Sequence, residues 1–231
     1  MFRTTRWSLI AAAGDPHAPD SRQALADLCG QYWYPVYAYV RRRGSDRHKA
    51  EDLTQGFFAR LLETNDLAAA DRTRGRFRTF LLTACQHFLA NRHDYESARK
   101  RGGGVPPLAI DFGEGEERFT HEPADAHTAE AEFERRWAVA LLDQALKELR
   151  AEYAESGKAA VFDVLKGTLT GDGPAYRDLG VRLGLSEGAV KVAVHRLKQR
   201  YRDRLRAVIA ETVDTPADVD DEIRDLFAAL G

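Results

Sequence analysis

Apolar side chains recur at helical spacing in four stretches of the chain, and this pattern predicts an all-α fold. The stripes are, in chain order, Leu25, Leu28, Cys29 and Tyr32; Leu53, Phe57, Phe58, Leu61 and Leu62; Phe77, Phe80, Leu81, Ala84, Cys85, Phe88 and Leu89; and Phe133, Trp137, Leu141, Leu142, Ala145 and Leu149. No pair of β-rich runs flanks an Asn-Gly turn, as a hairpin would require. Pro35 should kink or restart the first helix, because proline lacks an N–H and clashes with the preceding turn.

Glycine and proline mark one strong break, at Gly102-Gly103-Gly104 and Pro106-Pro107. Residues 102–128 are therefore expected to form a flexible acidic linker between two small helical domains, 1–101 and 129–213. Residues 214–231 read as an acidic amphipathic helix. A helix of about a dozen residues is not stable alone in water. The tail should therefore dock, either completing the second domain or covering its basic face.

Residues 176–197 have the signature of a helix-turn-helix. Gly180 is small where two helices would approach closely, Gly184 suits a sharp turn with positive φ, and Ser186 is placed to cap the next helix. The buried stripe of that helix would be Val190, Val194, Leu197, Tyr201 and Leu205. Two other interpretations stay open, a packed helical hairpin without a ligand and a strand over 196–206.

Charge is clustered, although the 231 residues carry a net charge of only −2. Seven basic residues face two acidic ones in 74–101 and again in 187–206, whereas nine acids face one arginine in 111–134 and seven acids face one arginine in 211–231. Clustered positive charge is the footprint of a polyanion-binding protein. The alternative is two solvated helix faces.

The stretch from Arg74 to Phe80 alternates basic and aromatic residues and opens a helix. Such alternation suits single-stranded nucleic acid, because cations follow the phosphates while rings hold unstacked bases. The candidates for exposed contacts are Asn91, Arg92, Tyr95 and Arg99. The simpler interpretation makes Phe77, Phe80, Phe88 and Leu89 core residues.

Composition excludes several other classes. No run approaches the roughly 18 apolar residues of a membrane span, and two cysteines make no disulfide framework, so we expect a cytoplasmic protein. His121 and His127 lie near acids in the linker, but no third ligand has fixed spacing, and no nucleophile–base pattern is evident. We expect no metal, no cofactor and no enzymatic activity.

Three motifs in order give the chain a resemblance to the extracytoplasmic-function (ECF) group of bacterial RNA polymerase sigma factors. Residues 50–58, Ala-Glu-Asp-Leu-Thr-Gln-Gly-Phe-Phe, resemble the polymerase-binding helix of that family. Residues 77–81, Phe-Arg-Thr-Phe-Leu, resemble the start of its promoter-melting helix, and residues 185–191, Leu-Ser-Glu-Gly-Ala-Val-Lys, resemble its recognition helix. The resemblance runs from about residue 21 to residue 213.

The resemblance implies promoter-specific initiation of transcription. It places Asp52, Gln55 and Phe58 against the clamp helices of the largest subunit of core polymerase. It places Asn91, Arg92, Tyr95 and Arg99 at the melted −10 promoter element. The −35 element would be read as duplex DNA by Lys191, Val192, His195, Arg196 and Arg200, with Arg202 and Arg204 also near phosphates.

The sequence departs from the family pattern at Lys49, Gly56 and Ala189, so the docking helix is less acidic than usual and the promoter sequence is not inherited. Thr54 is a candidate phosphorylation site, since a phosphate would add about −1.5 to −2 charge near the docking surface. A Ser/Thr kinase and an anti-sigma factor are therefore further candidate partners. The rival function is a stand-alone helix-turn-helix regulator without a role in polymerase docking.

Overall fold

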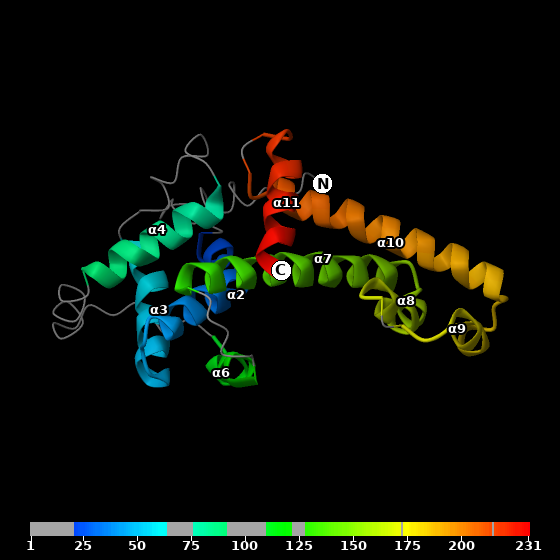
Figure 1. Cartoon of the computed structure of the whole chain (residues 1–231), viewed down its shortest axis with the longest axis horizontal. Helices are drawn as coiled ribbons and strands as arrows, with labels where there is room; N and C mark the ends of the chain where they lie inside the picture. Colours follow the sequence, from blue (N-terminus) through cyan, green and yellow to red (C-terminus); the bar gives the residue numbers. More distant parts are fainter. Residues whose placement is uncertain (1–20, 64–75, 92–109, 122–127, 172, 214) are drawn as a thin grey trace. The chain divides into compact units, whose positions relative to one another are not determined.

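A computed structural model describes residues 21–63, 76–91, 110–121, 128–171, 173–213 and 215–231 (Figure 1). The helices are α2 Ser21–Arg42, α3 Arg47–Glu63, α4 Phe77–Ala90, α6 Phe112–His121, α7 Ala129–Glu155, α8 Ala159–Leu165, the 3-10 helix η2 Lys166–Leu169, α9 Tyr176–Leu183, α10 Glu187–Ala210 and α11 Asp218–Leu230. These residues contain no strand, which confirms the all-α prediction for the described part of the chain. None of the described helices is both long enough and apolar enough to cross a membrane.

The chain divides into two compact units. The first comprises 1–140 together with 210–231, and the second comprises 141–209. The predicted domain limits stay a prediction. Residues 129–140 and the C-terminal tail both cluster with the N-terminal part of the chain, rather than with the segment that carries α9 and most of α10.

An aromatic cluster forms the centre of the first unit. The Tyr32 ring of α2 stacks on the Trp137 ring of α7 with centroids 4.3 Å apart, and Phe77 of α4 meets both rings, 5.4 Å from Tyr32 and 5.8 Å from Trp137. All three side chains are almost completely buried. Each large ring removes much apolar surface from water. Together the three rings join α2, α4 and α7 around one core.

Pro35 lies inside α2, and the helix continues through it to Arg42. The sequence prediction allowed a kink or a restart, and the restart is wrong. A proline inside a helix costs about 3 kcal/mol. The side chains around it offset this cost, because Tyr32, Val36, Tyr37 and Tyr39 are all fully buried. The helix ends at Arg42, and Gly44 follows with a φ of +87°.

Part of the segment expected to be a flexible linker forms the helix α6, which packs against α2. Phe112 is buried against the rings of Trp33 and Tyr37, at centroid distances of 5.4 and 5.6 Å. Gly115 sits so close to the Trp33 ring that no Cβ would fit. Glycine and acidic residues suggested a linker, but Gly115 permits close packing and one acid, Glu116, pairs with a half-buried arginine of α2.

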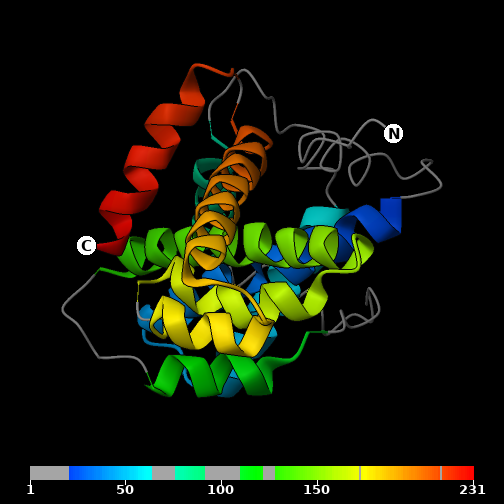
Figure 2. The same cartoon turned by 90° about the vertical axis from the view of Figure 1, so that its right-hand side faces the viewer.

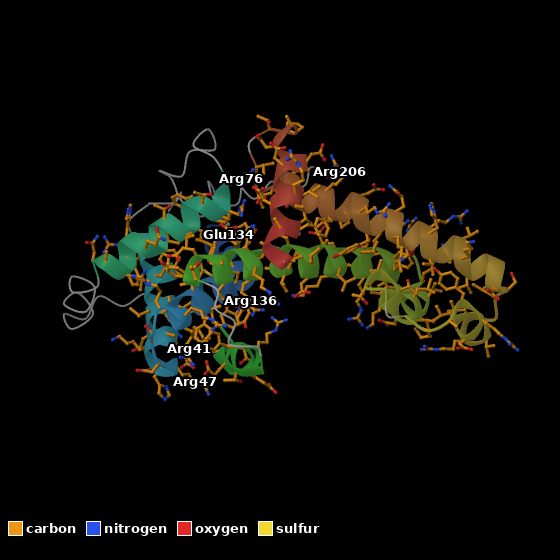
Figure 3. All side chains as sticks on the ribbon, in the orientation of Figure 1. Arg41, Arg47, Arg76, Glu134, Arg136 and Arg206 are labelled. Atoms are coloured by element: carbon orange, nitrogen blue, oxygen red, sulfur yellow. The ribbon has the colours of Figure 1, made fainter. Side chains whose placement is uncertain are left out.

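Glu116 is that acid. Both of its carboxylate oxygens accept hydrogen bonds from Arg41, with Nη2–Oε1 at 2.8 Å and Nε–Oε2 at 3.1 Å, and the Tyr37 hydroxyl also donates to it. Burial by itself would raise the pKa of Glu116, but the bonds from Arg41 and Tyr37 outweigh burial and hold the pKa below its ordinary value. Figure 3 shows Arg41 on the side of α2 that faces α6.

The second unit has its own core, built from α7, α8, α9 and α10. Its buried side chains are Leu149, Tyr153, Phe162, Leu165, Leu179, Val190, Val194 and Leu197. The Tyr201 hydroxyl donates a hydrogen bond to the Leu142 carbonyl at 3.2 Å, which ties α10 to α7. The continuous helix over 187–210 shows that the strand interpretation of 196–206 is wrong.

Acid should release α6 before the rest of the first unit unfolds. Because the pKa of Glu116 is lowered in the folded chain, its stabilising contribution is full above the ordinary glutamate pKa of about 4.3 and is lost as the pH falls below it. At neutral pH, Glu116→Gln should cost about 1–2 kcal/mol and speed amide hydrogen exchange in α6. The exposed neighbour supplies the control, Glu117→Gln, which should have little effect. If the difference in the free energy of unfolding between wild type and Glu116→Gln were as large at pH 3 as at neutral pH, the stabilising role of the Glu116 carboxylate would be contradicted.

Candidate nucleic-acid interface

A sharp turn joins α9 to α10 and is built from local interactions. Gly184 ends α9 with a φ of +65°, and the Leu185 N–H donates to the Gly180 carbonyl at 2.9 Å. Ser186 then caps α10, because its Oγ accepts a hydrogen bond from the Ala189 N–H at 3.3 Å. The positive φ predicted for Gly184 and the cap predicted for Ser186 are both confirmed.

Gly180 permits the close approach that the sequence suggested. A Cβ at this position would lie 2.7 Å from the carbonyl oxygen of Leu185, nearer than a real Cβ ever approaches an oxygen. The backbone of the turn therefore rests directly on α9. Val190, the first buried residue of α10, lies just beyond this contact and is fully buried. The direction of α10 relative to α9 thus depends on having a glycine, without a side chain, at position 180.

One face of α10 is buried and the opposite face is exposed and basic. The buried residues Val190, Val194, Leu197 and Leu205 are those predicted from the sequence, and Tyr201 is half-buried. All five side chains predicted to meet duplex DNA are exposed, namely Lys191, Val192, His195, Arg196 and Arg200. Val192 is 50% exposed.

The fifth candidate, Arg200, is exposed but already has protein partners. Its Nη1 lies 3.1 Å from Glu152 of α7, and its guanidinium lies over the Tyr153 ring. Arg204 is held more firmly, by Glu152 at 2.9 Å and by Glu148 at 3.7 Å, and is half-buried. Two acids of α7 thus pair with Arg204, which counts against the expectation that Arg204 faces phosphates.

The three residues predicted to contact polymerase differ in exposure along α3. Asp52 is exposed, Gln55 is half-buried, and Phe58 is only 2% exposed, with its ring centroid 5.2 Å from that of Phe57. Of the three, Asp52 is the most exposed. Phe58 packs inside the first unit.

Thr54 is completely buried, and its Oγ1 has no hydrogen-bond partner among the described residues. The sequence placed Thr54 on or near the docking surface, and this placement is wrong. Thr54 follows Leu53 on the side of α3 that enters the core, since both side chains are buried. A kinase would need α3 to detach before it could reach the hydroxyl.

Of the four residues predicted to meet the −10 element, only Asn91 belongs to the described residues. It is exposed just after α4, and its N–H donates to the His87 carbonyl at 3.0 Å. The other three, Arg92, Tyr95 and Arg99, lie outside the described residues. The simpler interpretation of the sequence placed four residues of this helix in the core. Of these, Phe77 and Phe88 are buried, whereas Phe80 and Leu89 are half-buried.

The basic start of α4 meets the acidic tail, which sequence reasoning did not foresee. Glu222 of α11 lies 3.0 Å from Arg76 Nε and 2.9 Å from Arg78 Nε, and Asp225 contacts both arginines. The docking of the tail is confirmed, but both predicted sites for it are wrong, because α11 docks within the first unit. The opposite charges of 74–78 and 211–231 were the available signal.

The two cysteines are buried and free, and burial raises the pKa of both thiols to about 12. Neither is therefore a thiolate near neutral pH. Within the described part of the chain, no three His, Cys, Asp or Glu side chains gather into a group that could hold a metal ion.

Comparison with known proteins gives one informative similarity. The chain is 27% identical over 213 residues to the ECF RNA polymerase sigma factor SigE of Mycolicibacterium smegmatis, covering 91% of this chain and 72% of that protein. No protein-family model matches the chain. No solved structure matches it. At this identity the similarity supports, from a distance, the resemblance that the three motifs indicate.

The same substitution at two glycines should have opposite effects on stability. Gly180→Ala introduces a Cβ against the Leu185 carbonyl and should lower the free energy of unfolding by about 1–3 kcal/mol. Gly188→Ala lies in open space on α10 and should raise it by about 0.5–1 kcal/mol, because alanine favours a helix. Urea unfolding measures both. Equal effects at the two positions would contradict the close approach at Gly180.

Proposed function

We propose that the chain is an RNA polymerase sigma factor of the ECF type, which binds core polymerase and directs it to promoters. The observation that carries the proposal is the similarity to SigE. Because it spans 91% of the chain, it takes in both halves, and with them α3, α4 and α10. A stand-alone DNA-binding regulator would explain only the half that contains α10.

The exposed face of α10 supports a role in reading the −35 element as duplex DNA. A capped helix that leaves a sharp turn can enter the major groove with its first residues against base edges. Lys191 and Arg196 supply donors for guanine and phosphate, and the exposed Val192 suits a thymine methyl group. In this proposal Arg200 contacts a phosphate only if it leaves Glu152, whereas Arg204 stays with α7.

The exposed acid on α3 supports a docking role. In the proposal, Asp52 forms the charged contact with the clamp helices of the largest polymerase subunit, and Gln55, one turn along the same helix, adds a polar contact. Phe58 contributes from inside, because its buried ring fixes α3 against the core. The −10 element would be held by Asn91, Arg92, Tyr95 and Arg99, at and beyond the end of α4.

The proposal assigns no chemistry to the chain itself. A factor of this kind supplies binding energy and positioning, while the polymerase makes the bonds. Its partners are core polymerase and promoter DNA, and its place of action is the cytoplasm, where both are found. An anti-sigma factor stays a candidate partner. The burial of Thr54 gives the proposed kinase no accessible target in this conformation.

Reversing the charge at Asp52 should abolish association with polymerase. Asp52→Arg places a cation on an exposed position of α3, so the folded chain should persist while its contact with the clamp helices is lost. The measurement is co-elution of the purified chain with bacterial core polymerase. Glu155→Arg makes the same change of charge on an exposed position of α7 and should co-elute normally. Failure of the unmodified chain to co-elute, or retention by Asp52→Arg, would count against the docking role.

Removing two exposed cations from α10 should weaken binding to duplex DNA. Lys191→Ala with Arg196→Ala should reduce affinity for mixed-sequence duplex and lower the slope of log affinity against log salt by about 2, one for each lost phosphate contact. Arg150→Ala removes an exposed arginine of α7 and serves as the control. Titration by fluorescence anisotropy at several salt concentrations gives both quantities. An unchanged slope would show that α10 does not face the DNA.

A further inference from the structure

The acidic helix α11 occupies the two arginines that begin α4. Glu222 lies 3.0 Å from Arg76 Nε and 2.9 Å from Arg78 Nε, and Asp225 Oδ2 lies 3.2 Å from Arg78 Nη2 and also contacts Arg76. Glu134 of α7 also contacts Arg78. Figure 3 shows Arg76 at the end of α4 nearest α11, with Glu134 on α7 close by. Arg78 keeps only 11% of its side-chain surface exposed.

The backbone and a few apolar side chains hold α11 in this position. The Phe77 N–H, at the first turn of α4, donates to the Thr212 carbonyl at 3.2 Å. Val219 and Leu226 are the apolar anchors of α11, each 4% exposed, whereas Phe227 on the same helix is 56% exposed. In both views the end of α11 lies next to the first turns of α7 (Figures 1 and 2). Few apolar side chains of α11 are buried, so the ion pairs with Arg76 and Arg78 form a large part of its contact with the first unit.

The ion pairs are less stabilising than their number suggests. Glu222 is 2% exposed, and burial raises the pKa of its carboxyl group even though Arg78 and Arg76 oppose that shift. The cost of removing a carboxylate from water offsets much of its attraction to the arginines. A helix of 13 residues does not persist alone in water. The docked state of α11 is therefore open to competition from any ligand that pairs with the same arginines.

Nucleic-acid phosphates are such ligands. Asp225 accepts hydrogen bonds from both arginines, from Arg78 Nη2 at 3.2 Å and from Arg76 Nη1. A phosphate that approaches the same N–H groups competes with Asp225 for them, and it also competes with Glu222 for the two positive charges. Arg76 and Arg78 flank Phe77 in the stretch whose alternation of basic and aromatic residues suits single-stranded nucleic acid. While α11 is docked, its carboxylates take the place of the phosphates.

We infer that α11 is an intramolecular competitor of single-stranded DNA for Arg76 and Arg78, so that the free chain binds such DNA weakly until α11 is displaced. This inference rests on the proposed function, which brings melted promoter DNA to the first unit. It adds a built-in restraint on DNA binding to that function, and the released α11 would expose Val219, Leu226 and Phe227 together.

The test uses the full chain and a fluorescein-labelled single-stranded 20-mer of mixed sequence. The variant Glu222→Gln with Asp225→Asn removes the two charges of α11 that contact Arg76 and Arg78, and leaves Glu134 of α7 in contact with Arg78. The control, Glu155→Gln with Asp163→Asn, removes the same two charges from exposed positions in the second unit. At about 0.1 M salt the variant should bind roughly five- to twentyfold more tightly than the control, as expected for two freed phosphate contacts. Equal affinities for variant and control would overturn the inference.

Hydrogen exchange on the unmodified chain gives a second reading that does not depend on a variant. Saturation with the same oligonucleotide should speed amide exchange across 218–230, because bound DNA displaces α11. Unchanged or slower exchange there would overturn the inference even if the variant failed to fold.

Co-elution with core polymerase separates the two claims. A chain that co-elutes, but whose variant and control bind the oligonucleotide equally, refutes the competition by α11 and leaves the proposed function standing. A chain that does not co-elute, but whose variant binds the oligonucleotide more tightly than the control, refutes the proposed function and supports the competition.

Discussion

The first unit depends on the contact among Tyr32, Phe77 and Trp137. These rings belong to three different helices and are buried almost completely, so α2, α4 and α7 have one relative position in which all three fit. Loss of a buried ring of this size typically costs about 3–5 kcal/mol, which is a large share of the stability of a small domain. Phe77 points inward, and Arg76 and Arg78 on either side of it are half-buried against α11. The aromatic contact thus fixes the charges to which α11 binds.

The second unit depends on a different constraint, the absence of a side chain at Gly180. The turn that leads into α10 rests on α9 at a distance no Cβ would permit. The turn, the Ser186 cap and the buried stripe beginning at Val190 then set which face of α10 is exposed. That face carries Lys191, Val192, His195 and Arg196. The proposed contact with DNA is therefore a consequence of backbone geometry as much as of charge.

Features encoded by a few neighbouring residues were predictable from the sequence. The helical class, the turn at Gly184 and the cap at Ser186 each depend on interactions within one or two helical turns, and all three agree with the structure. Features that depend on distant partners were not predictable. Glu116 looked like a linker acid because nothing near it in sequence reveals Arg41, 75 residues away.

Thr54 and the acidic tail show the same limit. The period of an amphipathic helix does not say whether a residue at the edge of the apolar stripe is covered, and Thr54 proves to be buried. The tail has enough acidic residues to bind either of the basic segments, 74–101 or 187–206. It binds at the start of α4 because the segment that leads into α11, with Thr212 and Val213, lies beside Phe77. Arg204 was assigned to DNA because its partners on α7 lie some 50 residues earlier in the sequence, 52 in the case of Glu152.

The central claim is that this chain makes core polymerase initiate at particular sites. The most direct measurement is transcription in vitro with bacterial core polymerase and a library of genomic DNA fragments, in which the 5′ ends of the transcripts are mapped with and without the chain. The Glu222→Gln, Asp225→Asn variant is included so that a docked α11 does not conceal activity. The account predicts a small set of 5′ ends that depend on the chain and share sequence elements upstream. Transcripts identical to those of core polymerase alone, obtained with folded protein that binds duplex DNA, would contradict it.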